Sequence, residues 1–207
     1  MQDTAIKICG LVSEDDIAIV NALPITYAGF VLFYPKSKRN LTVARAAELI
    51  RGLNPSIKPV AVTVSPTLEQ VKEIERAGFA YLQVHKELHR TVEEHTKLPI
   101  IRVINVEKED DVKQVFTEES EKIAYIAFDG YVPGSGRTFD WGFLIRNVDN
   151  PAKIMLAGGL HTENVREAIR MVHPGIVDVS SGVEKEQGCG KDKGKVEQFV
   201  KAVLGAC

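Results

Sequence analysis

The stretch of residues 154–184, IMLAGGLHTENVREAIRMVHPGIVDVSSGVE, contains one pattern twice. A short apolar run at 154–157 ends in Gly158-Gly159, and a helix is predicted to follow from about Thr162. A second apolar run at 176–179 ends in Ser180-Ser181-Gly182. Short apolar runs of this kind are typical of buried strands. The stretch therefore predicts two strands of one parallel sheet, joined by a helix.

Small residues follow both of these strands. They let backbone N–H groups approach a ligand closely, and a helix that begins nearby favours an anion. This interpretation predicts that Gly158, Gly159, Ser181 and Gly182 hold a phosphate. The alternative is a pair of ordinary loops, because glycine and serine are common in turns of any function.

The same alternation runs through the whole chain. Apolar runs predict strands at 5–9, 28–33, 59–64, 81–85, 99–103, 123–128, 154–157 and 176–179. Between and after them, amphipathic or capped segments predict helices after Ser13, near 43–50, 67–78, 89–96 and 108–116, around Trp141, and after Thr162 and Asp192. Eight strand–helix units of about 25 residues predict a (β/α)8 barrel.

A doubly wound open sheet is the competing architecture for such an alternation. The first turn, Cys9-Gly10-Leu11, lacks the glycine pattern of a dinucleotide site, which argues against that architecture. No linker or low-complexity segment divides the chain, so residues 1–207 are expected to form a single barrel domain.

Composition excludes several classes of function. The net charge is −2 with no basic stripe, so nucleic acid is not an expected partner. The sequence has neither an apolar run of membrane-spanning length nor a signal-peptide pattern. Its three cysteines, Cys9, Cys189 and Cys207, are far apart and match no disulfide or zinc spacing. We expect no metal and a reducing, cytoplasmic location.

Cys9 ends the first strand, at the edge where barrels of this kind carry their active sites. Alternation places Lys7 on the same face, and its charge is expected to favour the thiolate. Cys9 is then a candidate base or nucleophile. The alternative is a small buried core residue, which is the commonest environment of a free cysteine.

Asp129 directly follows the sixth predicted strand. A carboxyl group at that depth needs a partner, or it stays protonated and able to donate a proton, although an Asp-Gly pair also suits a turn. Asp178 points inward, where an ion pair with Lys7 is the simplest explanation. Arg39 suits a carboxylate or phosphate but stands in a basic run that could be surface. His85 ends the fourth predicted strand and is either a site residue or a core histidine.

Several segments together resemble the phosphoribosylanthranilate isomerase family of tryptophan biosynthesis. They occur in order from about residue 6 to the last helix. These segments are Lys7-Ile8-Cys9-Gly10-Leu11, Gly29-Phe30-Val31, Tyr34-Pro35-Lys36-Ser37 with Arg39, Leu82-Gln83-Val84-His85, residues 134–141 (GSGRTFDW), residues 156–160 (LAGGL) with Glu163-Asn164-Val165, and residues 177–184 (VDVSSGVE).

The resemblance implies a fold, a reaction and residue roles. The family's fold is the (β/α)8 barrel, and its reaction is the Amadori rearrangement of N-(5-phosphoribosyl)anthranilate to the deoxyribulose 5-phosphate aminoketone. Cys9 matches the general base, Asp129 the general acid, and Arg39 the residue that grips the anthranilate carboxylate. The backbone at Gly136, Gly158-Gly159 and Ser181-Gly182 would hold the phosphate, with Lys7, His85 and Asp178 in support.

The resemblance also implies what the protein binds. Its partner would be a small phosphosugar, and it would need no cofactor or metal, because the iminium formed on ring opening is itself the electron sink. A monomer or a homodimer is expected. Lys86 and residues 187–190 depart from the family pattern, so the phosphate side is where affinity is expected to differ.

Two other functions fit a similar barrel. The histidine-pathway isomerase of the same reaction type uses a carboxylate where Cys9 stands and binds two phosphates, whereas only one phosphate grip is evident here. A non-catalytic scaffold barrel would have no need of both Cys9 and Asp129, yet both are present.

Overall fold

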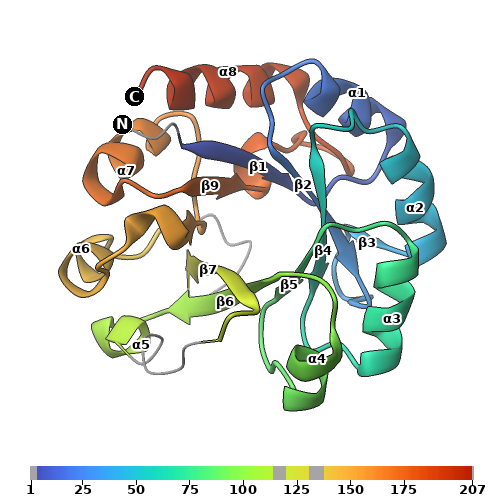
Figure 1. Cartoon of the computed structure of the whole chain (residues 1–207). Coiled ribbons are helices and arrows are strands. Elements are labelled where there is room, and N and C mark those ends of the chain that lie inside the picture. Colours follow the sequence, from blue (N-terminus) through green and yellow to red (C-terminus); the bar gives the residue numbers. More distant parts are fainter. Residues whose placement is uncertain (1–3, 114–119, 131–137, 207) are drawn as a thin grey trace.

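The computed structural model describes residues 4–113, 120–130 and 138–206. Figure 1 shows strands gathered at the centre with helices around them. The strands are β1 (Ala5–Cys9), β2 (Tyr27–Leu32), β3 (Asn40–Leu41), β4 (Lys58–Thr63), β5 (Tyr81–Val84), β6 (Ile100–Val106), β7 (Ile123–Gly130), β8 (Ile154–Leu156) and β9 (Ile176–Val179). The helices are α1 (Glu14–Asn21), α2 (Val43–Arg51), α3 (Leu68–Arg76), α4 (Arg90–His95), α5 (Glu109–Lys113), α6 (Gly142–Asn147), α7 (Val165–Val172) and α8 (Lys193–Leu204).

Eight of the strands close into a parallel barrel in the order β1-β2-β4-β5-β6-β7-β8-β9, and β9 returns to β1. The two-residue β3 pairs only with the end of β2 and lies outside this ring. The predicted (β/α)8 barrel is confirmed. The open-sheet alternative is excluded, because β1 pairs with β2 on one side and with β9 on the other.

Two apolar layers follow from the alternation of side chains along the strands. One set faces outward and packs against the helices, for example Ile6 and Ile8 of β1. The other set fills the barrel and includes Tyr27, Val62, Ile101, Val103, Ala127, Met155 and Ile176, together with Cys9. The expected placement of Cys9 on the face opposite Ile6 and Ile8 is confirmed.

Capping residues begin several helices where the sequence predicts them. The Ser13 side chain accepts a hydrogen bond from Asp16 N, and Thr67 forms a capping box with Gln70. Asp192 caps α8 by accepting from Lys195 N at 2.9 Å. The helix expected from Thr162 begins only at Val165, and Trp141 precedes α6 rather than lying within it.

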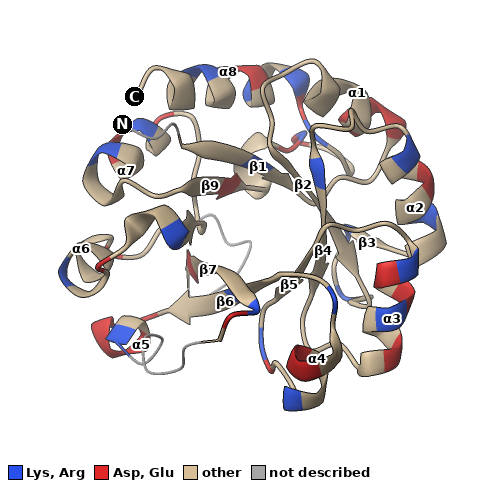
Figure 2. Ribbon diagram, in the orientation of Figure 1, with Lys and Arg blue, Asp and Glu red and all other residues tan. Residues whose placement is uncertain are grey.

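Charged side chains lie mostly on the outer helices and loops, with few on the strands (Figure 2). Within the described residues, no helix is long and apolar enough to cross a membrane. The few charges that do lie on strands include Lys7 and Asp178, which are buried inside the barrel. Of these two, Asp178 also lines the cavity at the carboxyl ends of the strands.

Candidate active site

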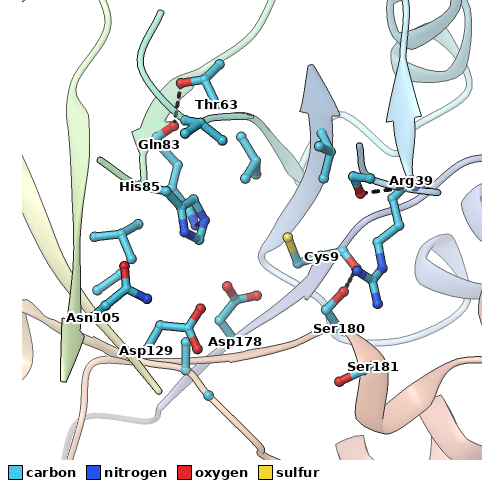
Figure 3. A pocket seen from close by; sticks show the side chains of 18 of the residues that line it. Cys9, Arg39, Thr63, Gln83, His85, Asn105, Asp129, Asp178, Ser180 and Ser181 are labelled. Atoms are coloured by element: carbon cyan, nitrogen blue, oxygen red, sulfur yellow. Dashed lines mark hydrogen bonds between the residues drawn. The ribbon is translucent and has the colours of Figure 1, made fainter. Parts of the chain in front are cut away.

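A cavity of about 640 Å³ opens where the strands end at their carboxyl side. Its walls include residues that follow or end β1, β2, β5, β7, β8 and β9. Most of the predicted site residues line it, namely Cys9, Arg39, His85, Asp129, Gly158, Gly159, Asp178 and Ser181. Figure 3 labels all of these except the two glycines. Gly136 falls outside the described residues.

Cys9 and Asp129 lie on different walls of this cavity. Cys9 ends β1 and Asp129 lies near the end of β7, and β9 and β8 separate these strands around the barrel. Figure 3 shows both side chains at the cavity, with the Asp178 carboxylate between them in this view. A sugar ring between these walls would therefore meet a thiol on one side and a carboxyl group on the other.

The surroundings of Cys9 differ from expectation in one respect. Burial raises the pKa of the thiol, and although the neighbouring Lys7 and Lys191 ammonium groups lower it, burial outweighs them. Lys7 lowers the pKa of the thiol, as predicted, but burial and the Asp178 carboxylate together raise it by more. The sequence pattern indicates that Lys7 lies near Cys9, but it does not show how far burial removes water from the thiol.

Lys7 is completely buried and is held by Asp178, with Nζ 2.8 Å from Oδ2. Burial opposes the charge of Lys7, yet Asp178 and Cys9 together raise its pKa, so it stays an ammonium ion. The predicted ion pair is confirmed. A Cβ atom at Gly29 would lie 2.9 Å from Cys9 Sγ and 3.2 Å from Lys7 Nζ, so a glycine is needed there to make room for both.

Asp129 has the environment of a carboxyl group that can act as an acid. Burial raises its pKa to about 6, and the nearby Asp178 carboxylate adds to the rise. The positively charged Lys7 opposes it only in part. A carboxyl group with a pKa near neutrality can donate a proton under ordinary conditions.

His85 also lines the cavity and directly follows β5. Burial lowers its pKa to about 4, so the imidazole is neutral at pH 7. Its Nε2 lies 3.1 Å from the amide nitrogen of Gln83, which is itself buried. Gln83 and Asn105 line the cavity without having been predicted; Asn105 Nδ2 donates to Gly130 O at 3.1 Å and so braces the end of β7 beside Asp129.

The predicted phosphate grip divides into residues at the cavity wall and one behind it. Gly158 and Gly159 have φ of 79° and 66° and line the wall, as does Ser181 at the start of a 3-10 turn, Ser181–Val183. Gly182 instead packs behind the wall, because a Cβ atom there would lie 2.3 Å from the carbonyl oxygen of Leu160. The turn's close packing therefore depends on this glycine.

Arg39 reaches the cavity from the loop after β2, with its side chain 19% exposed. The alternative of a solvated surface residue is thus excluded. Its Nε donates to Glu184 Oε1, a contact that the sequence did not predict. Within the described residues, no three His, Cys, Asp or Glu side chains are grouped as metal ligands.

Residues 6–202 match the family model for N-(5'phosphoribosyl)anthranilate (PRA) isomerase. The chain belongs to this family. The N-(5'-phosphoribosyl)anthranilate isomerase of Streptococcus mutans is 35% identical over 202 residues, which cover 97% of this chain and 98% of that protein. The phosphoribosyl anthranilate isomerase structure from Thermotoga maritima is 32% identical to this chain, with a TM-score of 0.86. The match covers 98% of this chain and 99% of the Thermotoga maritima chain.

A further solved structure shows a family member with a ligand. It is a phosphoribosyl anthranilate isomerase in complex with reduced 1-(o-carboxyphenylamino)-1-deoxyribulose 5-phosphate. Its TM-score to this chain is 0.82 at 29% identity, covering 98% of this chain and 99% of that one.

Proposed function

We propose that this protein isomerises N-(5'-phosphoribosyl)anthranilate to 1-(o-carboxyphenylamino)-1-deoxyribulose 5-phosphate, a step of tryptophan biosynthesis. The observation that carries the proposal is the pairing of Cys9 and a raised-pKa Asp129 on different walls of one cavity, in a chain of this family. The reaction is an internal oxidation and reduction, in which an aldose derivative becomes a ketose derivative.

Asp129 is the general acid in this proposal. Its proton passes to the furanose oxygen of the substrate, the C1–O bond breaks, and an open-chain iminium ion forms. Burial raises the pKa of the carboxyl group to about 6, so a minor fraction of the protein carries it protonated at pH 7 and can donate the proton. After transfer, the carboxylate lies near the Lys7 ammonium group, which stabilises its charge.

Cys9 is the general base. The iminium ion makes the proton at C2 acidic, because its loss forms a neutral enamine. The thiolate takes that proton. The resulting enamine carries a hydroxyl group at C2, so it is also an enol, and it tautomerises to the product ketone. Burial disfavours the thiolate in the empty site, but Lys7 and Lys191 lower this cost, and a cationic iminium beside the sulfur would lower it further.

The remaining cavity residues bind rather than react. Arg39 would pair with the anthranilate carboxylate through its planar fork of donors. Backbone N–H groups at Gly158-Gly159 and Ser181 would hold the phosphate. The positive φ angles of the two glycines and the small side chain of Ser181 suit that approach. Gly136 belongs to the same proposal on the family pattern alone.

The test supplies the substrate as it forms. Anthranilate and phosphoribosyl pyrophosphate are combined with the transferase that joins them, and the fluorescence of the substrate is followed after this protein is added. We expect rapid decay beyond spontaneous hydrolysis, with the aminoketone identified by mass. Decay no faster than hydrolysis, although the reduced product analogue still binds, would instead support a non-catalytic barrel.

A further inference from the structure

Glu184 lies at the centre of a cluster of ion pairs beside the cavity. Its side chain is only 9% exposed, and three cations surround it. Arg39 Nε and Lys191 Nζ share Oε1, the latter at 3.3 Å, and Lys38 Nζ lies 2.9 Å from Oε2. Burial alone would raise the pKa of this carboxyl group, but the three cations hold it at about 2, so Glu184 is an anion throughout the physiological range.

Lys191 ties this cluster to the strand that carries the base. Its side chain is fully buried, and Nζ also donates to the carbonyl oxygen of Ser180 at 3.2 Å. The Ser180 hydroxyl in turn donates to the carbonyl oxygen of Cys9 at 2.9 Å. The backbone N–H of Lys191 is fixed as well, because it donates to the buried carboxylate of Asp16 at 2.6 Å. Glu184 is therefore anchored to a rigid part of the barrel rather than to a loose loop.

The Arg39 side chain is confined at two points along its length. Its Cδ lies over Gly10, where a Cβ atom would come within 2.5 Å of it. Its Nε is engaged by Glu184. Among the residues that the structure describes, none accepts a hydrogen bond from the two terminal guanidinium nitrogens. The end of the fork is thus left for a planar, two-oxygen acceptor.

We propose that Glu184, backed by Lys191, is the positioning residue that orients Arg39 for end-on pairing with the substrate's carboxylate. Glu184 touches no substrate in this proposal and acts through Arg39. The inference rests on the proposed function, since it assumes that a carboxylated aromatic amine occupies the site. It adds to that function by explaining why a buried acid stands beside a residue whose task is to bind another acid.

The test compares two stable ligands with two matched variants. The ligands are reduced 1-(o-carboxyphenylamino)-1-deoxyribulose 5-phosphate and the same compound without the carboxylate. The variants are Glu184→Gln/Lys191→Met and Glu184→Leu/Lys191→Met. Both remove the same charges and leave no unpaired buried lysine, but only glutamine keeps an oxygen that can accept from Arg39 Nε. Dissociation constants are measured by calorimetry on protein whose folding is verified by thermal unfolding.

Wild-type protein is expected to prefer the carboxylated ligand. The glutamine variant should keep most of that preference, and the leucine variant should lose about tenfold of it, with little change in affinity for the ligand lacking the carboxylate. Equal preferences in the two variants would overturn the positioning role, as would equal weakening of both ligands by the leucine variant. A wild-type protein with no preference would instead overturn the proposed role of Arg39.

Discussion

At the scale of single residues, burial determines the acid–base properties of the site, because it removes the water that would stabilise the charged forms of its ionisable side chains. Asp129 and Cys9 both have raised pKa values, and burial is the largest cause in each case. With a pKa of about 6, Asp129 is protonated in a minor fraction of the protein at pH 7 and can donate from that form. The thiol instead needs the positive charge of Lys7, Lys191 and the substrate's iminium to lose its proton. The same cavity therefore suits the two steps in order, ring opening first and proton removal second.

Replacing Asp129 by asparagine should stabilise the protein while removing its acid. The change in pKa from 3.8 to about 6 corresponds to roughly 3 kcal/mol in favour of the neutral form. Because the folded pKa is raised, this contribution to stability is complete below about pH 4 and is lost as the pH rises through 6. Asparagine is neutral at every pH, so Asp129→Asn should gain about 1–3 kcal/mol at pH 7 relative to wild type.

Urea unfolding of both proteins between pH 4 and pH 7 measures this gain. The difference should shrink toward pH 4, where wild-type Asp129 is itself protonated. A difference that stays constant across this range would show that Asp129 does not carry the raised pKa. Turnover by Asp129→Asn should fall about a hundredfold or more, as for the loss of a general acid.

Sequence reasoning predicted the cavity residues that end strands but not those that support them. Cys9, Asp129, Asp178 and His85 were found from strand position alone. Glu184 and Lys191 were missed as a pair, because their partner Arg39 lies far away along the chain. Nothing local in the sequence brings β2 and β9 loops together; barrel closure does.

At the scale of elements, the loop after β8 shows how local hydrogen bonds set boundaries. The helix expected from Thr162 begins at Val165 because Asn164 holds the preceding residues in a turn. Its Oδ1 accepts from His161 N at 2.8 Å, and its Nδ2 donates to Gly159 O at 2.9 Å. The side chain that delays the helix also fixes the glycine pair of the proposed phosphate grip.

Gly158 is expected to be the least replaceable glycine of this loop. A Cβ atom there would lie 2.3 Å from Gly130 N and 2.9 Å from Asp129 Oδ1, at a φ of 79°. Gly158→Ala should therefore cost about 2–4 kcal/mol and, by displacing Asp129, lower kcat about a hundredfold. Gly78 is the matched control, because its φ is 87° but nothing lies within 4 Å of its Cβ position.

Gly78→Ala should cost only about 1 kcal/mol and leave kcat unchanged. Unfolding in urea and initial rates on the two variants give both quantities. If the two alanine variants were equally stable and equally active, crowding of Asp129 by residue 158 would not be a feature of the protein in solution.

At the scale of the whole molecule, the barrel is closed at one end and open at the other. Tyr27, Tyr81 and Tyr125 pack together on the amino-terminal side, with ring centroids 5.6–6.3 Å apart and Tyr27 and Tyr125 hydroxyls at 3.2 Å. The cavity lies on the carboxyl side, where the strand ends meet. The barrel architecture was predictable from eight repeated units. The tyrosine cluster was not, because its three side chains come from β2, β5 and β7, which only the closed barrel brings together.

The ion pair between Lys7 and Asp178 joins β1 to β9, where the barrel closes. Lys7→Met should cost about 3–5 kcal/mol, because it leaves the Asp178 carboxylate without its partner. Lys7→Met/Asp178→Leu should recover most of that loss but not the activity, since Cys9 then lacks the ammonium group that lowers its pKa. Urea unfolding and rates on both variants test this; a double variant no more stable than the single one would contradict it.

The account depends most on Cys9 as the base, and its removal is the most direct test. Cys9→Ala deletes one buried sulfur atom and leaves the acid, Arg39 and the phosphate grip in place. Its kcat for N-(5'-phosphoribosyl)anthranilate, measured beside wild type in the fluorescence assay, should fall at least about a hundredfold. Affinity for the reduced product analogue should stay within a few-fold. A Cys9→Ala variant that turns over at nearly the wild-type rate would contradict the central claim.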